Sequence, residues 1–466
     1  MGLNKSLGLV LAVATLTTVA ALGGTAYIGR TVETKMTTEA KVTLEKIAPL
    51  VRVKAFNYDK SLLGATRTMT LQFGCDDKPL QMTWRDQIKH GPFPRFTGFG
   101  AATVDSELLL SDETKAQLKA NYGLEVPALK VKSVVALNGD VTSDATLPAI
   151  SGKLPDGTQL IWQGMTLHSV QTGATVDYEV VVPGFEMRAL EKGTSLKLSG
   201  AKVKGLTNHG KFWWAKLGSS TGEVSKIEMT AKQGGKEFKM LASHLQSTSS
   251  SKLEGEMMSA SSEMKGQFEF DKIKLEKVQI ASSVKRLHAP TLDAMMTAIF
   301  SQNGAALLCS NFADPQTREA LQQQVAKQLV NMLQESALKL LAFNPEYSVD
   351  KMAASYLGKE GELSYSLGVQ GVTADEAKRV KDDPKAVIKK LALAASLKLP
   401  VPWIRNIIAS AGGNDKAPDD AALAKMIEPM VQQGFVVREG DLLLLKASMK
   451  DGKATLNGKE VPVPGM

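Results

Sequence analysis

The sequence predicts an α+β, β-rich fold. An N-terminal transmembrane helix is followed by a long antiparallel β-meander that forms a curved sheet, and amphipathic helices occupy the C-terminal third. Two observations carry this prediction. Short segments that alternate apolar and polar residues, separated by turn signals, succeed one another up to about residue 289. Apolar residues at helical spacing become frequent only after Pro290.

Residues 7–28 contain no charged side chain and are long enough to cross a bilayer. The run LGLVLAVATLTTVAALGGTAYI has 22 residues, and about 20 helical residues span the hydrocarbon core. We therefore expect a transmembrane signal anchor at 7–28, with residues 1–6 as a cytoplasmic head that carries Lys5. A cleaved secretory signal and a buried terminal helix are the alternatives. Val19-Ala20-Ala21 would suit cleavage, but the run is longer than the usual core of a signal peptide.

Residues 29–289 are expected to form one β-rich region. After an amphipathic helix predicted at 31–50, Ala65 and Leu71 share one face of a strand whose other face carries threonines. Turn signals such as Pro183-Gly184 separate the later segments. Further strands are predicted at 103–110, 129–137, 159–170, 175–182, 195–203, 222–231, 236–248, 252–260 and 266–284. Because no βαβ rhythm appears, each strand should pair with its neighbours through hairpins.

Residues 290–466 are expected to form a mixed α/β region that packs on the sheet. Asp314-Pro315 supplies an N-cap and a proline in the first turn of a helix. An apolar stripe follows at Leu321, Val325, Leu329, Leu333, Ala337 and Leu341. Helices are also predicted at 291–301, 403–411 and 419–433, strands at 362–372, 391–399 and 441–449, and a linker or short helix at 373–385. Either these helices cover the apolar strand faces, or the sheet curls and leaves an apolar groove.

The composition and the net charge limit the kinds of protein and partner that are possible. A chain of 466 residues with 43% hydrophobic residues can form two or three domains with real cores. The net charge of +8 is typical of a dispersed, solvated surface, and attraction to anionic lipid headgroups is the alternative. No basic run is interleaved with aromatic residues, so we expect no nucleic-acid partner. Cys75 and Cys309 match no zinc or haem spacing; they are either small buried side chains or a disulfide pair.

No catalytic, metal-binding or cofactor-binding pattern is recognisable. The sequence contains no GxSxG, HExxH, Walker or EF-hand motif. Its histidines, which are spread too widely to form a local ligand pair, are His90, His168, His209, His244 and His288. His90 begins the pentapeptide HGPFP, whose prolines predict a rigid turn. We therefore expect no enzyme, no cofactor and no metal, and we assign no ligand-binding residue.

Three other groups have a structural and a functional interpretation. Phe212-Trp213-Trp214 favours core packing or interfacial anchoring over ligand stacking. Asp382-Asp383 and Asp419-Asp420 favour solvated or capping positions. The methionines are Met257, Met258, Met264, Met295 and Met296. They are typical of adaptable core filling, with a pliable lining for acyl chains or varied partners as the functional alternative.

Several motifs together resemble a known family. They are Asn4-Lys5-Ser6 before one apolar span, the segment from Tyr58 to Gly64, the pentapeptide HGPFP, and a hairpin ending Leu456-Asn457-Gly458-Lys459. In order and length they resemble the YdgA/YihF family of Gram-negative envelope proteins, a domain of unknown function. This resemblance implies an inner-membrane anchor with the bulk of the chain in the periplasm. It brings no catalytic residues with it.

These patterns lead to one preferred function and two alternatives. The preferred function is a membrane-anchored envelope protein without catalysis that binds or guides lipids or other amphipathic ligands on a curved sheet. The first alternative is a structural or partner-binding module of an envelope complex. The second is an envelope hydrolase whose site is assembled only in the fold. The expected partners are inner-membrane lipids together with an amphipathic ligand or envelope proteins.

Overall fold

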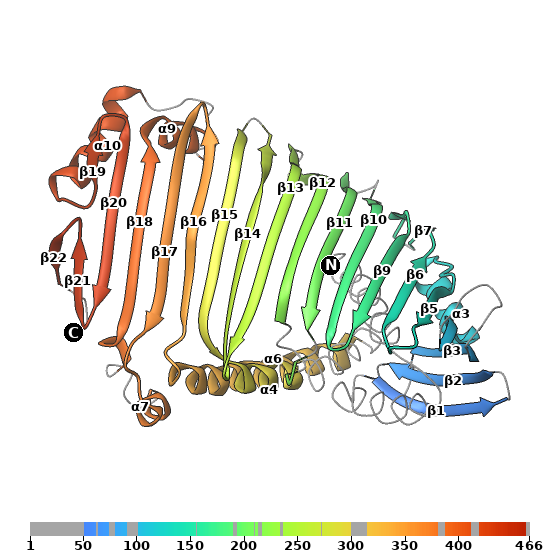
Figure 1. Cartoon of the computed structure of the whole chain (residues 1–466). Coiled ribbons are helices and arrows are strands. Elements are labelled where there is room, and N and C mark those ends of the chain that lie inside the picture. The colour runs from blue at the N-terminus through green and yellow to red at the C-terminus, as the bar shows by residue number, and fades with distance from the viewer. Residues whose placement is uncertain are drawn as a thin grey trace. The chain divides into compact units, whose positions relative to one another are not determined.

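The computed structural model describes thirteen stretches of the chain (Figure 1). They are residues 51–61, 64–73, 80–90, 101–154, 156–189, 193–208, 210–212, 217–233, 236–271, 273–299, 315–380, 387–411 and 419–462. Long antiparallel strands dominate, which confirms the β-rich part of the predicted fold. The predicted anchor at 7–28, the helix at 31–50, Cys75 and Cys309 lie outside these residues. None of the described helices combines the length and the apolar character needed to cross a membrane.

Contacts along the chain define two units, each described by itself. Unit 1 comprises Met1–Ser220, Glu228–Glu237 and Leu292–Gln334, and unit 2 comprises Thr221–Ile227, Phe238–Thr291 and Glu335–Met466. Residues of both units occur in β12 (Leu217–Gln233), β13 (Lys236–Glu254), α4 (Ala289–Ala298) and α6 (Pro315–Leu341). The predicted boundary between residues 289 and 290 stays a prediction.

Unit 1 contains an antiparallel sheet in which most strands pair with their neighbours in sequence. The strands are β1 (Val51–Lys60), β2 (Gly64–Phe73), β3 (Leu80–His90), β4 (Ala102–Leu110), β5 (Leu129–Val135), β6 (Val141–Leu147), β7 (Ile150–Lys153), β8 (Gln159–Trp162), β9 (Met165–Thr172), β10 (Thr175–Ala189) and β11 (Thr194–Asn208). The pairing order is β1–β2–β3–β4–β5–β6–β9–β10–β11. The hairpin β7–β8 pairs with the second half of β10.

One face of this sheet is a closed core. Strands β4 and β5 alternate strictly between buried and more exposed residues, as a half-buried strand should. Leu71 and Trp84 are each only 1% exposed, and Leu118 of helix α3 (Asp112–Tyr122) packs against their cluster. The core also encloses an ion pair between Arg67 and Asp86, whose side chains are 4% and 1% exposed.

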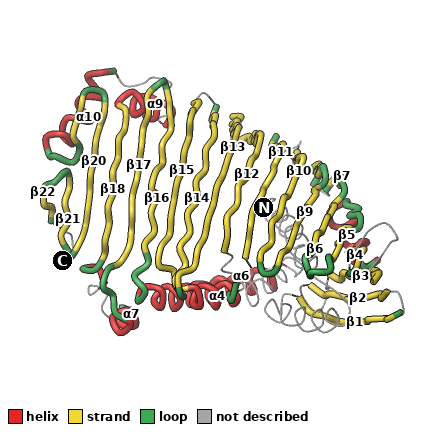
Figure 2. Tube along the Cα trace, in the orientation of Figure 1, coloured by secondary structure: helices red, strands yellow, loops and turns green. Residues whose placement is uncertain are grey.

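Unit 2 also consists mainly of long antiparallel strands, and Figure 2 shows them side by side. Beyond β13 its strands are β14 (Met257–Phe270), β15 (Ile273–His288), β16 (Glu346–Tyr356), β17 (Lys359–Val369), β18 (Leu391–Pro400), β19 (Val437–Glu439), β20 (Leu442–Lys450), β21 (Lys453–Leu456) and β22 (Lys459–Val461). The pairing order is β13–β14–β15–β16–β17–β18–β20–β21–β22, and β19 pairs with β20. Its helices are α7 (Ala374–Arg379), α9 (Val401–Ala411) and α10 (Asp420–Gln432).

The structure corrects several predicted element boundaries. Helix α3 was not predicted, although Ser111 caps it and Gly123 ends it in the left-handed conformation. The turn predicted at Pro183-Gly184 is wrong, because β10 continues through both residues. The predicted break between residues 248 and 252 is also wrong: β13 runs to Glu254, and the turn follows at Gly255, whose φ is +63°. The predicted strand 266–284 is divided by a turn at Asp271.

Candidate functional site

The strand register of unit 2 assigns its side chains to two opposite faces. Residues that pair directly across antiparallel strands point to the same face, and neighbours along a strand point to opposite faces. Three neighbouring cross-strand rows define what we call the uncharged face. The rows are Ala260, Val284, Tyr347, Leu367, Leu393 and Met449; Ser249, Ser262, Ser282, Val349, Tyr365, Ala395 and Ala447; and Ser247, Met264, Ile280, Met352, Leu363, Leu397 and Leu445.

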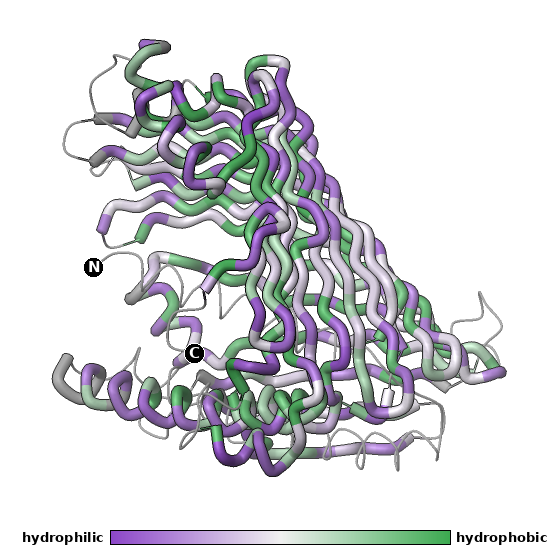
Figure 3. Tube along the Cα trace, turned by 90° about the vertical axis from the view of Figure 1, so that its left-hand side faces the viewer, coloured by the Kyte–Doolittle hydropathy of each residue, from purple (hydrophilic) through white to green (hydrophobic). Residues whose placement is uncertain are grey.

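No residue of these three rows carries a charge. The other face of the same strands, which we call the charged face, is different. It presents Lys252, Glu263, Lys265, Lys285, Glu346, Lys351, Glu362, Lys398 and Lys446. There the Lys265 ammonium lies 3.0 Å from the Glu263 carboxylate, and this contact, with a hydrogen bond from Gln279, lowers the pKa of Glu263. Hydrophobic and hydrophilic residues also alternate along the strands in Figure 3. The sheet of unit 2 is therefore strongly two-sided.

Much of the uncharged face is open to solvent. Five large side chains in its middle strands are between 37% and 47% exposed, namely Tyr347, Met352, Tyr365, Leu367 and Leu393. The Tyr347 and Tyr365 rings contact each other with centroids 6.2 Å apart. Tyr365 also raises the pKa of Tyr347 above its ordinary value of 10.0, so the Tyr347 phenol is neutral at pH 7. An exposed apolar patch of this kind marks an interaction surface.

Helices cover the sheet at the two ends of its strands (Figure 1). At one end, Leu443 and Leu445 lie in a cluster with Ile404 of α9 and Ile427 of α10. Trp403 of α9 stands over Gly361 and donates from its indole nitrogen to the Tyr356 carbonyl at 3.0 Å. At the other end, Val369 and Leu391 pack with Ala377 of α7. The exposed middle strands therefore lie between two helical borders.

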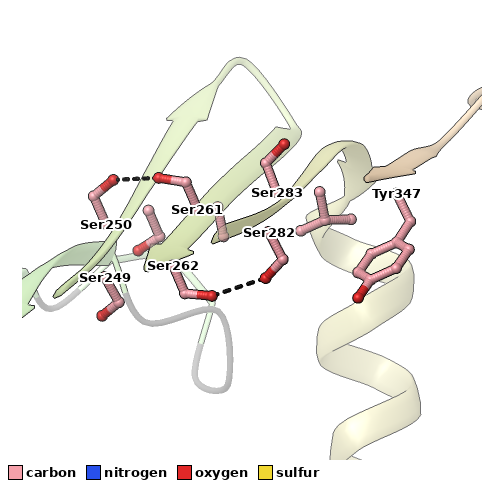
Figure 4. A pocket seen from close by; sticks show the side chains of 10 residues that line it. Ser249, Ser250, Ser261, Ser262, Ser282, Ser283 and Tyr347 are labelled. Carbon is pink, nitrogen blue, oxygen red and sulfur yellow. Dashed lines mark hydrogen bonds between the residues drawn. The ribbon is translucent and has the colours of Figure 1, made fainter. Parts of the chain in front are cut away.

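A cavity opens over strands β13 to β16 (Figure 4). Its volume is about 260 Å³. Most of its lining, including Ser249, Ser262, Ser282, Val284 and Tyr347, belongs to the uncharged face, and Ser250, Ser261 and Ser283 of the charged face line it as well. Ser262 and Ser282 share a hydrogen bond of 2.9 Å between their hydroxyl oxygens. Because serine and alanine are small, they leave a hollow beside the larger Val284 and Tyr347 side chains. The lining of the hollow carries serine hydroxyls and no charged side chain.

The histidines found by sequence do not form one site among the described residues. His168 lies 2.7 Å from the Asp144 carboxylate at an exposed position of unit 1. His244 lies on β13 and His90 ends β3. His209 lies outside the described stretches. No group of three or more His, Cys, Asp or Glu side chains in the described part of the chain is arranged to hold a metal ion.

The His288 ring contacts both a hydroxyl and a carboxylate. Its Nδ1 lies 2.8 Å from the Thr291 hydroxyl, and its Nε2 lies 3.2 Å from the Glu256 carboxylate. Its ring also stacks on Phe343, with the ring centroids 3.8 Å apart. No sequence pattern indicates this cluster, because Glu256 lies in the turn before β14 and Phe343 follows the end of α6. None of these residues lines the serine cavity.

The remaining predicted groups divide between described and undescribed residues. Met264 lies on the uncharged face. Asp419 caps α10 by accepting from the Ala422 amide at 2.7 Å, which confirms its capping role. Trp213, Trp214 and Asp382-Asp383 lie outside the described stretches. Sequence reasoning missed the serines of the cavity, because serine is also common on solvated strand faces.

Comparison with known proteins gives one match. The model of a family described as a bacterial protein of unknown function (DUF945) covers residues 3–464, nearly the whole chain. No curated protein and no solved structure matches the sequence.

Proposed function

This chain belongs to the DUF945 family of bacterial proteins of unknown function, and we propose that it binds the hydrocarbon chains of lipids on the uncharged face of unit 2. In this proposal the protein is a non-catalytic component of the cell envelope. Residues 7–28 anchor it in the inner membrane, and the remainder works in the periplasm, as the resemblance to YdgA/YihF proteins implies. The absence of charge across three adjacent rows is the observation that carries the proposal.

Physical chemistry supports a hydrocarbon ligand. Each methylene group that leaves water for an apolar surface contributes about 0.8 kcal/mol, and the face offers Leu367, Leu393 and Met352 as exposed apolar partners. Tyrosine rings add flat apolar area at a low cost in side-chain entropy. A hydrocarbon chain lying across the strands would contact no charged group that binding would have to desolvate.

Photocrosslinking with a matched pair of positions tests this proposal. A benzoylphenylalanine residue replaces Tyr365 on the uncharged face or, in the control, its neighbour Ser366 on the charged face. The full-length protein is irradiated in intact cells, purified and analysed by mass spectrometry. We expect lipid adducts at Tyr365 and none at Ser366. Protein adducts at Tyr365 in place of lipid adducts would favour the partner-binding module, and no difference between the two positions would reject both.

The proposed location has its own test. A reporter that is active only outside the cytoplasm, fused behind Met466, should be active in whole cells, and removal of residues 7–28 should abolish that activity. A fusion that behaves as cytosolic with the segment present would reject the periplasmic assignment.

A second candidate function, an envelope hydrolase, has one observation in its favour. His288 contacts both a hydroxyl, on Thr291, and a carboxylate, on Glu256, which is how a base is arranged between a nucleophile and an orienting acid. However, His288 directly precedes α4 and stacks on Phe343, so the same contacts fix the start of a helix. Lipid crosslinking at Tyr365 and hydrolysis of a panel of ester substrates should be compared in a Thr291→Ala variant. Loss of a measurable hydrolysis in that variant would favour the hydrolase.

A further inference from the structure

The uncharged face is not uniform from one side to the other. In its central row, the strands β13 to β15 contribute Ser249, Ser262 and Ser282, whereas the strands β16 and β17 contribute Val349 and Tyr365. The hydroxyl-bearing half holds the cavity of about 260 Å³, and the exposed aromatic and aliphatic side chains belong to the other half. A ligand that complements both halves therefore has a hydrogen-bonding part joined to a hydrocarbon part.

The hydroxyl half can bind a polar group of the ligand. Each serine hydroxyl has one O–H to donate and two lone pairs to accept with. The Ser262 and Ser282 hydroxyls are 2.9 Å apart, and their mutual hydrogen bond uses only one of their two O–H groups. An ester carbonyl or a free hydroxyl of a ligand could accept from, or donate to, the same pair. These are neutral hydrogen bonds, which need no counter-ion.

The same half is poorly suited to an anion. None of the three rows contains Lys, Arg or His, and the lysines of these strands point to the charged face. A carboxylate or phosphate placed in the cavity would lose part of its hydration without gaining a cation, and this desolvation is costly. Two neutral serine hydroxyls do not replace a charge-assisted pair.

We infer that the ligand of the uncharged face is a neutral glycerolipid, an acylglycerol whose ester or hydroxyl group occupies the serine cavity while its acyl chain crosses β16 to β18. This inference rests on the proposed function, since it names the class of lipid that the same face binds. It excludes fatty acids as the preferred ligand. The direction of the chain follows from the order of the strands: the glycerol end lies over β14 and β15, and the methyl end lies toward β18.

A competition between two ligands with the same chain tests the inference. Full-length protein is purified in a non-ionic detergent, stripped of lipid, and mixed with equal amounts of monooleoylglycerol and oleate at pH 9, where the fatty acid is ionised. Native mass spectrometry measures the ratio of the two complexes. We expect at least tenfold more monooleoylglycerol complex.

Two variants locate the groups responsible. Ser262→Ala removes a hydroxyl with little change in volume, and should reduce the preference to below threefold while chain binding persists. Leu367→Glu places a charge in the path of the chain and should reduce binding of both ligands more than tenfold. Ser366→Ala, on the charged face of β17 and outside the cavity, is the control and should leave the ratio unchanged. Circular dichroism of each variant confirms that the sheet is intact.

The outcomes separate the inference from the function on which it rests. Equal binding of the two ligands, or a preference for oleate, overturns the neutral-lipid assignment and leaves chain binding in place. A preference that Ser262→Ala does not reduce overturns the role of the cavity. If neither ligand binds, the proposed function itself fails. A lipid-independent dimer that Leu367→Glu dissociates would show that a second copy of the chain covers this face, which also overturns the inference.

Discussion

The two units use the same kind of strand but differ in what covers it. Leu71 of unit 1 and Leu367 of unit 2 both lie on the apolar side of an alternating antiparallel strand, yet Leu71 is 1% exposed and Leu367 is 47% exposed. In unit 1 the apolar side is closed and even encloses an ion pair. In unit 2 helices border the strand ends and leave the middle open. The comparison shows that alternation makes a sheet two-sided without deciding whether its apolar side becomes a core or a binding surface.

The largest effect on this comparison should come from the buried ion pair of unit 1. Asp86 accepts hydrogen bonds from the Arg67 guanidinium and, at 2.6 Å, from the Trp84 indole. Asp86→Asn keeps the shape but leaves the Arg67 charge unpaired in a closed core, so we expect a loss of about 3–5 kcal/mol of stability. Hydrogen exchange of peptides from β2 to β4 under increasing denaturant measures it.

A matched exposed pair on the same strands supplies the control. Arg85 and Glu107 lie 2.6 Å apart on the opposite face, with side chains 44% and 31% exposed. Glu107→Gln should cost less than about 1 kcal/mol, because water already solvates both groups. Equal losses in Asp86→Asn and Glu107→Gln would mean that the core of unit 1 is not closed.

The second prediction applies one substitution to both units. Leu71→Ala should cost about 2–5 kcal/mol, because it removes buried methyl groups and leaves a cavity. Leu367→Ala should cost less than about 1 kcal/mol, since nearly half of that side chain is already in water. Chemical denaturation with unit-specific hydrogen exchange reports each loss. A large loss for Leu367→Ala would indicate that another part of the chain covers the uncharged face, and would remove the basis for a binding surface.

The third prediction concerns the border of the open face. A Cβ atom on Gly361 would lie 2.7 Å from the Trp403 ring, so Gly361→Ala must push the indole away. The expected cost is about 1–3 kcal/mol from overpacking, with faster hydrogen exchange in α9. Gly205, which lies beneath Tyr178 in unit 1 with a corresponding separation of 2.6 Å, is the matched position. If Gly361→Ala leaves exchange in α9 unchanged, Trp403 does not hold that helix on the sheet.

The sequence predicts the part of this architecture that depends on near neighbours. Asp451-Gly452 has the composition typical of a hairpin turn, and the strands do pair across it, with Asp451 and Gly452 both at positive φ. The strand predicted at 362–372 is present as β17, and Leu363, Tyr365 and Leu367 share one of its two faces. Turn residues within strands were misleading, because Pro183 and Gly184 are accommodated inside β10, where Gly184 pairs with Ser199. Ser111 and Gly123 form a complete capping signal for α3. It was overlooked because the segments before and after it alternate as strands do.

The candidate site could not be predicted from the periodicity of single strands, because it depends on the register in which the strands pair. Ser249, Ser262 and Ser282 come from three strands, and only the cross-strand register places them on one face with Tyr365. A shift of one residue in any pairing would have moved them to the charged face. The bulges in β14 and β16, which set that register, leave no recognisable sequence signal. The Glu256–His288 contact was missed for the same reason, because it closes only when β14 and β15 are paired.

The smallest expected effect is a pH dependence that both units share. The ammonium groups of Lys202 and Lys204 lower the pKa of Glu179 in unit 1 to about 2. Hydrogen bonds from Lys390 and Thr373 lower that of Glu376 in unit 2 to about 2. Because both folded values lie below the ordinary 4.5, each carboxylate stabilises the fold above pH 4.5 and loses that contribution as the pH falls toward 2.

Neutral substitutions assign this dependence to each unit. Glu179→Gln and Glu376→Gln should each flatten the decline of the unfolding midpoint between pH 4.5 and pH 2, and neither should alter its slope above pH 5. Glu376 belongs to the capping box of α7, so its substitution should also loosen the helix at the border of the uncharged face. If unit 1 carried the effect, lipid adducts at Tyr365 would decrease below pH 4.5 in the wild type but would keep their pH 7 level in Glu179→Gln. The structure places the border in unit 2, so Glu376→Gln is the variant expected to remove the pH dependence of binding.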